Sequence, residues 1–206
     1  MMKTRELVFS RFERFWHWFQ AILIIGLMIT GFEVNGAYTL FGYEKAADYH
    51  RMVAWVLIWL WVFAIFWHLI TGEWKQYVPT TERLFAVMKY YSVGIFDHSI
   101  PHPYKKTKRF KHNPLQRIAY SVFNIAISPI IWISGLLYMY YNDWPASWGL
   151  TLGDVALVHV AAAFAMLIFF VMHLYMAFTG HPPMQYVKAM ITGYDDVYSD
   201  QHGAQK

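Results

Sequence analysis

The chain has 206 residues, a length that allows one domain or two small ones. It is 57% hydrophobic and 15% charged, whereas an ordinary soluble domain carries about 25% charged residues. A water-soluble fold of this size could not bury so much apolar surface, so the composition argues against a soluble protein. The sequence contains no cysteine, which excludes disulfides, a c-type haem attached through C-x-x-C-H and cysteine-ligated iron–sulfur clusters.

Four long uncharged runs predict four transmembrane helices, because a helix needs about 20 apolar residues to cross a bilayer. Their lengths are 18, 21, 25 and about 25 residues, and they are Phe15–Phe32, Met52–Gly72, Ile118–Asn142 and Val155–Thr179. The first run lacks a small-residue cleavage site and is taken as a mature span. We expect an all-α integral membrane four-helix bundle, one domain over residues 1–206, with spans near 15–33, 50–72, 114–141 and 154–179.

The positive charges predict the orientation of these spans. Fifteen of the 17 Lys and Arg residues lie before the first span, between the second and third, or after the fourth; only Lys45 and Arg51 lie in the other two connections. Positive loops stay on the cytoplasmic side. The sequence therefore predicts a multi-pass protein of the bacterial inner membrane with both termini in the cytoplasm.

The long connection between spans two and three contains three local signals. Pro79-Thr80-Thr81-Glu82 precedes an amphipathic stretch over 83–91, which predicts a short capped helix in the membrane interface. A basic cluster of Lys105, Lys106, Lys108, Arg109 and Lys111 suits anionic lipid headgroups. Nucleic-acid binding is not expected, because no soluble basic face is present. Asn113-Pro114 is typical of a helix start.

Five of the ten histidines lie in or at the edge of the spans: His17, His50, His68, His159 and His173. Ionisable residues inside a membrane are costly, so a functional role is the default interpretation. Their depths form two tiers. His50 and His159 lie towards the outer ends of spans two and four, whereas the other three lie towards inner ends. His159 and His173 are 14 residues apart, which puts them near one helix face and about 21 Å apart.

Pairs of neutral imidazoles at two depths of one bundle suit two b-type haems, each held by two axial histidines. His50 and His159 form the only outer pair. The inner haem would take His173 with either His17 or His68, and spacing does not choose between them. The alternative is that individual histidines only hydrogen-bond neighbouring helices.

The chain resembles the bacterial membrane cytochrome b family that includes the formate dehydrogenase gamma subunit and the cytochrome b subunits of nickel–iron hydrogenase and thiosulfate reductase. The pieces that carry the resemblance include Arg14-Phe15-Trp16-His17-Trp18, Thr30-Gly31, His50-Arg51, Thr71-Gly72-Glu73-Trp74, Asn113-Pro114-Leu115-Gln116, Ser134-Gly135 and the His159/His173 pair. The Thr-Gly-Glu-Trp and Asn-Pro-Leu-Gln pieces look most like the thiosulfate-reductase-type branch.

The resemblance implies two haems b, His17 with His173 for the inner one and His50 with His159 for the outer one. It also implies a quinone site around Asn113 and Gln116, where Leu115 stands in place of a glycine of the formate dehydrogenase form. Arg117 and His112 lie at the same depth and could also hydrogen-bond a quinone. His68 is no ligand in the formate dehydrogenase pattern, so its role stays open.

Our primary hypothesis is a membrane subunit that passes electrons between menaquinone or ubiquinone at the inner face and a periplasmic redox subunit. That partner would be a multihaem cytochrome c, an iron–sulfur protein or similar, and the substrate chemistry would lie on it. Two alternatives remain. One is a transition-metal or haem transporter that uses the histidines as transient ligands; the other is a passive membrane anchor.

Overall fold

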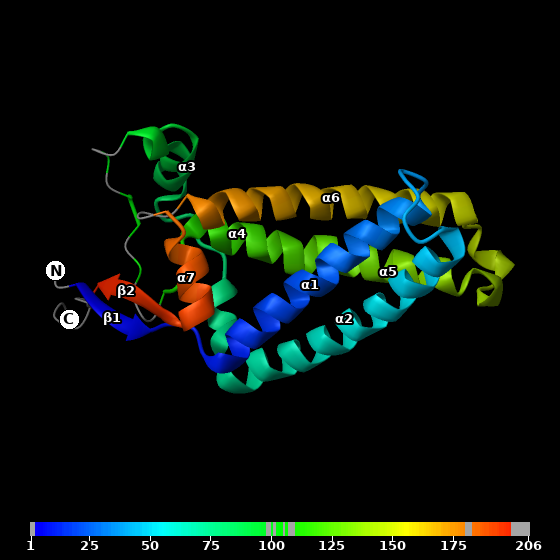
Figure 1. Ribbon diagram of the computed structural model, residues 1–206, viewed down its shortest axis with the longest axis horizontal. Coiled ribbons are helices and arrows are strands. Elements are labelled where there is room, and N and C mark those ends of the chain that lie inside the picture. The colour runs from blue at the N-terminus through cyan, green and yellow to red at the C-terminus, as the bar shows by residue number, and fades with distance from the viewer. Residues whose placement is uncertain are drawn as a thin grey trace. The chain divides into compact units, whose positions relative to one another are not determined.

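The computed structural model describes residues 3–97, 100, 102–104, 106, 110–179 and 183–198. Four helical segments in this part of the chain are long and apolar enough to cross a membrane: α1 (Arg11–Val34), α2 (Tyr43–Thr71), the segment Pro114–Met139 and α6 (Leu152–Phe178). Each of them overlaps one of the four predicted spans. The all-α integral membrane fold is thereby confirmed (Figure 1).

Shorter elements complete the described chain. In sequence order they are β1 (Lys3–Leu7), η1 (Glu73–Tyr77), α3 (Leu84–Ser92), η2 (Gly94–Phe96), α4 (Pro114–Val122), η3 (Phe123–Ile127), α5 (Ser128–Met139), η4 (Tyr141–Asp143), η5 (Ala146–Trp148), α7 (Gln185–Thr192) and β2 (Tyr194–Tyr198). Two compact units contain them. Unit 1 comprises Met1–Arg11, Glu73–Ser128 and Ile168–Lys206, and unit 2 comprises Phe12–Gly72 and Pro129–Leu167.

Aromatic and polar side chains join the four helices of unit 2. The Trp61 indole of α2 donates to Gln20 Oε1 of α1 at 2.5 Å and stacks on Trp132 of α5 with ring centroids 4.6 Å apart. Phe32 of α1 meets Phe164 of α6 edge to face at 5.6 Å. Each helix therefore contacts a neighbour through its side chains, as the predicted bundle requires.

Helix α2 begins at Tyr43, seven residues before the predicted start of the second span. Glu33 at the end of α1 explains the difference, because its Oε1 accepts the backbone N–H groups of Leu40, Phe41 and Gly42 at 2.7–2.8 Å. Gly42 then takes a positive φ of 86°, which glycine adopts without strain, and the helix begins. His50 consequently lies two turns inside α2 rather than at its edge.

The third span is not a uniform α-helix. Residues Phe123–Ile127 form a π-helical turn, in which the Ser128 N–H bonds the Phe123 carbonyl. Pro129 follows directly, and it has no N–H to continue the α-helical ladder. The wider turn therefore follows from the proline, a cause that the hydropathy pattern does not contain.

The two predicted helix starts have different outcomes. Asn113 caps α4 with a complete capping box: its Oδ1 accepts the Gln116 N–H at 2.9 Å, and Gln116 Oε1 accepts the Asn113 N–H at 3.0 Å. The helix predicted over 83–91 exists as α3, but its predicted cap is wrong. Arg83 is the N-cap residue, with a φ of 58° and no capping side chain, because the chain turns left-handed there after Glu82.

An antiparallel pair of short strands in unit 1 was not predicted. β1 pairs with β2 in a register that joins Thr4 to Val197 and Leu7 to Tyr194 (Figure 1). Next to the pair, Val8, Phe9, Ala189 and Val197 form a small buried cluster. β1 reads Lys-Thr-Arg-Glu-Leu and β2 reads Tyr-Asp-Asp-Val-Tyr, so neither strand has the alternation of polar and apolar residues that identifies a strand in a sequence.

Candidate functional site

His50 of α2 and His159 of α6 face each other in unit 2. Their ring centroids lie 6.2 Å apart and their planes are nearly perpendicular, at 82°. Both rings are half-buried. This is the outer pair that the sequence predicted, and the fold brings together two rings that lie more than 100 residues apart in the chain.

The Nδ1 atom of His50 lies 3.0 Å from the hydroxyl oxygen of Thr30, a buried residue of α1. That hydroxyl has one proton, and it donates it to the Gly26 carbonyl at 2.8 Å. The Thr30 oxygen therefore acts as an acceptor towards the imidazole. The proton of the neutral His50 ring is therefore on Nδ1.

The same arrangement recurs at His159. Its Nδ1 lies 3.1 Å from the hydroxyl oxygen of Ser134, a buried residue of α5, and that hydroxyl donates to the Ile130 carbonyl at 2.6 Å. The Ile131 carbonyl, which can only accept, lies 3.1 Å from the same Nδ1. Both neighbours require a donor, so the His159 proton also sits on Nδ1.

A glycine follows each hydroxyl residue and lies directly against the corresponding ring. A Cβ added to Gly31 would come within 3.0 Å of His50 Cε1, and a Cβ added to Gly135 would come within 3.0 Å of His159 Cε1. That separation is tighter than almost all contacts that real Cβ atoms make. Only glycine leaves the two rings where they are.

These contacts fit two axial ligands of one iron porphyrin. With protons on both Nδ1 atoms, each neutral ring keeps its lone pair on Nε2, the usual ligating atom in such sites. The two facing rings, with centroids 6.2 Å apart, would hold the iron of one haem between them. No group of three or more His, Cys, Asp or Glu that could hold a metal ion occurs among the described residues.

The remaining intramembrane histidines occupy different surroundings. His68 is buried in unit 2, with Nδ1 2.7 Å from the Ala64 carbonyl and the Trp16 ring edge-on at 5.1 Å. His17 belongs to the same unit and meets the Trp18 ring at 5.1 Å. His173 belongs to unit 1, where it stacks on Phe169 at 6.1 Å. Which histidine shares a haem with His173 stays a prediction.

His112 lies among aromatic rings in unit 1. The Tyr120 and Tyr77 ring centroids lie 5.1 and 5.5 Å from its own, and Phe9 lies at 6.3 Å. Burial is the main reason that the pKa of His112 is lowered to about 3. The charges of nearby cations, Lys106 above all, also contribute to this lowering. The imidazole is therefore neutral at neutral pH and can accept a hydrogen bond.

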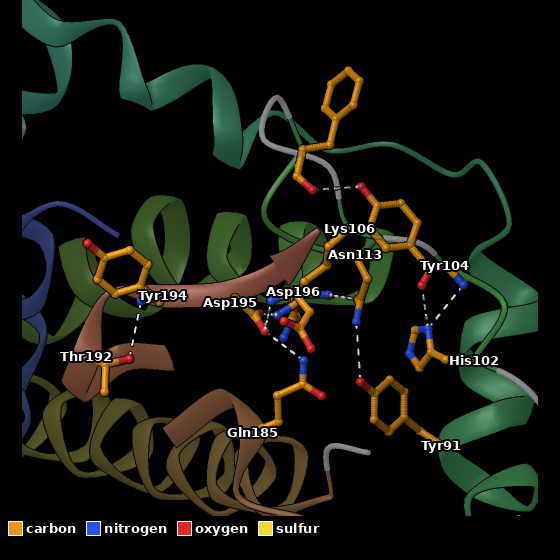
Figure 2. Close-up of polar contacts among 12 residues, drawn as sticks. Tyr91, His102, Tyr104, Lys106, Asn113, Gln185, Thr192, Tyr194, Asp195 and Asp196 are labelled. Atoms are coloured by element: carbon orange, nitrogen blue, oxygen red, sulfur yellow. Dashed lines mark hydrogen bonds and ion pairs between the residues drawn. The ribbon is translucent and has the colours of Figure 1, made fainter. Parts of the chain in front are cut away.

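Asn113 and Gln116 are two of the predicted quinone residues. Their side-chain oxygens accept backbone N–H groups in the capping box of α4. The Asn113 amide also lies 3.5 Å from the Tyr91 hydroxyl, as Figure 2 shows. Arg117 differs from both. Its Nε donates to the His112 carbonyl at 3.2 Å, but its buried Nη2 has no hydrogen-bond partner among the described residues. Of the four predicted quinone residues, Arg117 thus retains a buried donor for a ligand.

Two members of the basic cluster are paired with acids rather than exposed. Lys111 Nζ lies 2.9 Å from Glu73, and Lys106 Nζ lies 2.8 Å from Asp195. Lys105, Lys108 and Arg109 lie outside the described residues. The lipid-headgroup interpretation of the cluster therefore no longer applies to Lys106 and Lys111, whose charges are already balanced.

Sequence reasoning did not identify Thr30 and Ser134 as partners of the histidines. Both stand in a hydroxyl–glycine dipeptide, and both dipeptides were noted only as part of the resemblance. The sequence did contain one signal, because the hydroxyl–glycine dipeptide occurs twice. Each time it lies in the long helix that precedes the helix carrying the histidine.

Comparisons with known proteins place the chain in a family of membrane cytochromes. Residues 8–193 match the family model described as prokaryotic cytochrome b561. The chain is 28% identical over 203 residues to the protein named "Putative cytochrome YdhU" of Escherichia coli (strain K12), a match that covers 91% of this chain and 73% of that protein. No solved structure matches the chain. The comparisons support the family but not the thiosulfate-reductase-type branch in particular.

Proposed function

Because the chain belongs to the prokaryotic cytochrome b561 family of membrane haem b proteins, we propose that it is the di-haem b membrane subunit of a larger oxidoreductase. It transfers electrons between the quinone pool and a redox partner on the opposite side of the membrane. Haem b supplies the reversible one-electron chemistry of its iron when bound. The observation that carries the proposal is that His50 and His159 face each other and that each ring has its proton on Nδ1.

We assign these two histidines to the outer haem. Residues of unit 2 hold both rings through the Thr30 and Ser134 hydroxyls, whose contacts with Nδ1 fix the orientation of each imidazole. For the inner haem we assign His173 and His17, as the resemblance implies. His68 already bonds the Ala64 carbonyl and is proposed to pack the bundle.

The quinone is proposed to bind beside the start of α4. Quinone reduction and quinol oxidation move protons with electrons, so the site needs groups that can donate and accept hydrogen bonds. Arg117 supplies a buried donor, and the neutral His112 ring can accept a hydrogen bond from a quinol hydroxyl. Asn113 and Gln116 fix the backbone at the start of α4 through the capping box.

The orientation follows from the charge distribution of the loops. With Lys and Arg concentrated on one side, both termini lie in the cytoplasm and the quinone corner faces the cytoplasmic side of the inner membrane. The connections 35–42 and 140–151 then face the periplasm, where a multihaem cytochrome c or an iron–sulfur protein would dock.

The test is a dithionite-reduced minus oxidised spectrum of the purified full-length chain, with haem counted as pyridine haemochromogen. We expect two haems b per chain and the loss of one in both His50→Ala and His159→Ala. His102→Ala, a histidine in the connection before α4, is the matched control and should keep both. A colourless parent protein, or two haems in both outer variants, contradicts the proposal.

The quinone part has its own measurement. Arg117→Gln removes the buried guanidinium, and we expect the KM for a quinol analogue to rise several-fold while the haem content stays at two. Lys188→Gln, a change of the same kind on α7, should leave the KM unchanged. An unaltered KM in Arg117→Gln would argue against quinone binding at this corner.

A further inference from the structure

The two proposed ligands of the outer haem are held by matching sets of atoms. On α1 the set consists of the Gly26 carbonyl, the Thr30 hydroxyl and the Gly31 Cα; on α5 it consists of the Ile130 carbonyl, the Ser134 hydroxyl and the Gly135 Cα. In both, a hydroxyl residue bonds the carbonyl four residues earlier and is followed by glycine. In each case the next long helix of the chain carries the histidine: α2 after α1, and α6 after α5.

The distances repeat as closely as the sequence does. The hydroxyl oxygens lie 3.0 and 3.1 Å from the Nδ1 atoms, and a methyl group added at either glycine would lie 3.0 Å from the Cε1 atom of the ring. The carbonyl three residues before each hydroxyl, Leu27 or Ile131, also bonds the imidazole. Three contacts with the ring thus agree between two helix pairs with different sequences.

Their chemical effect follows from the direction of the hydrogen bonds. A hydroxyl that has already donated its proton to a carbonyl must accept from the ring, so the proton is fixed on Nδ1 and the lone pair on Nε2. An accepted Nδ1–H bond makes an imidazole a more basic ligand. A more basic ligand favours the oxidised, more positive iron and lowers the reduction potential.

We propose that Thr30-Gly31 and Ser134-Gly135 are paired positioning elements, whose hydroxyls set the tautomer and the reduction potential of the outer site and whose glycines set the ring orientation. This inference rests on the proposed function, because the potential belongs to the haem that His50 and His159 are assigned to hold. Neither dipeptide touches the iron; both act through the imidazoles.

The hydroxyl part is tested with Thr30→Val and Ser134→Ala in the purified haem-loaded chain. Potentiometric titration at the α-band should show one haem potential shifted upwards and the other unchanged, since only the outer pair is affected. Thr30→Ser should restore the parent potential. Thr179→Val is the matched control, because the Thr179 hydroxyl makes the same bonds to carbonyls, at 2.8 and 3.4 Å, as the Thr30 hydroxyl.

The glycine part is tested by electron paramagnetic resonance of the oxidised protein, which reports the relative orientation of the axial rings. Gly31→Ala and Gly135→Ala should change the g-values of one haem or remove that haem. Gly153→Ala is the matched control: Gly153 lies on the same helix as His159, and its added methyl meets nothing closer than 3.6 Å, so this variant should match the parent.

The outcomes separate the two proposals. A parent protein without haem overturns the proposed function and the inference with it. Two haems with parent potentials in both Thr30→Val and Ser134→Ala overturn the hydroxyl part alone, and parent g-values in both alanine variants overturn the glycine part. Loss of one haem in a hydroxyl variant supports the inference when Thr30→Ser retains it, and the remaining haem signal shows that the chain has folded.

Discussion

Lys106 and Asp195, 89 residues apart in the chain, form a 2.8 Å ion pair in unit 1 with side chains only 15% and 2% exposed (Figure 2). Gln185 of α7 donates to the other carboxylate oxygen at 2.6 Å. Burial lowers the pKa of Lys106, and the charge of Asp195 opposes that change. The pair thus joins the connection before α4 to strand β2.

Asp195→Asn should strongly destabilise unit 1, because it leaves the Lys106 charge buried without a counter-charge. Removing one partner of a buried pair costs about 3 kcal/mol. Thermal unfolding in detergent, followed by circular dichroism, measures the effect. Asp48→Asn breaks the exposed Asp48–Arg51 pair, whose side chains are both 57% exposed, and should change the stability by less than about 1 kcal/mol. Equal changes in the two variants would contradict the prediction.

His112 should make stability depend on pH. Its pKa is lowered from 6.5 to about 3 in the folded chain, so the unfolded chain binds more protons between these values. The contribution of His112 to the free energy of unfolding is therefore fully present above about pH 6.5 and is lost as the pH drops towards 3. His112→Gln cannot titrate, so its melting temperature should fall less between about pH 8 and pH 5. Parallel pH profiles for parent and variant would show that the ring is solvated.

Asn113 serves α4 as its N-cap, and two substitutions separate this role from quinone binding. Asn113→Ala should cost about 1 kcal/mol of stability, whereas Asn113→Asp keeps a capping oxygen and should cost little. If Asn113→Asp raises the KM for a quinol analogue without lowering the melting temperature, the amide itself contacts the quinone. If both quantities stay at parent values, Asn113 is a cap only.

His17 and His68 should differ in what their removal does. His17→Ala is expected to leave one haem per chain, whereas His68→Ala should keep two and lose stability, because His68 is buried against Trp16 and the Ala64 carbonyl. Pyridine haemochromogen analysis and thermal unfolding of the same samples measure both effects. The reverse pattern of haem loss would assign His68 as the partner of His173.

The hydropathy of the sequence predicts the four spans well, because membrane insertion depends on the length of apolar runs and little else. It places the start of the second span at residue 50, since Tyr43–Tyr49 contains charged residues. Those residues are helical because Glu33 binds three backbone N–H groups just before them. Such a contact depends on the fold and has no periodicity to detect.

The candidate site likewise has one feature that the sequence predicts and another that it does not. The histidine spacing predicts that His50 and His159 are neighbours, and they are. The roles of Thr30 and Ser134 cannot be derived from spacing, because a hydroxyl on a transmembrane helix ordinarily bonds only its own helix backbone. Both do so here, and their second contact, with a ring on another helix, exists only after the helices have packed.

The pairing of β1 with β2 sets an order on biogenesis. The ribosome releases β1 before any of the four helices, while its partner is made after the last of them. The two strands can close their ladder only after every intervening segment has been translated, and until then β1 has backbone groups that lack this partner. A chain arrested during insertion would present that open edge to chaperones or proteases, so closure of this small sheet marks a chain whose four spans have all been translated.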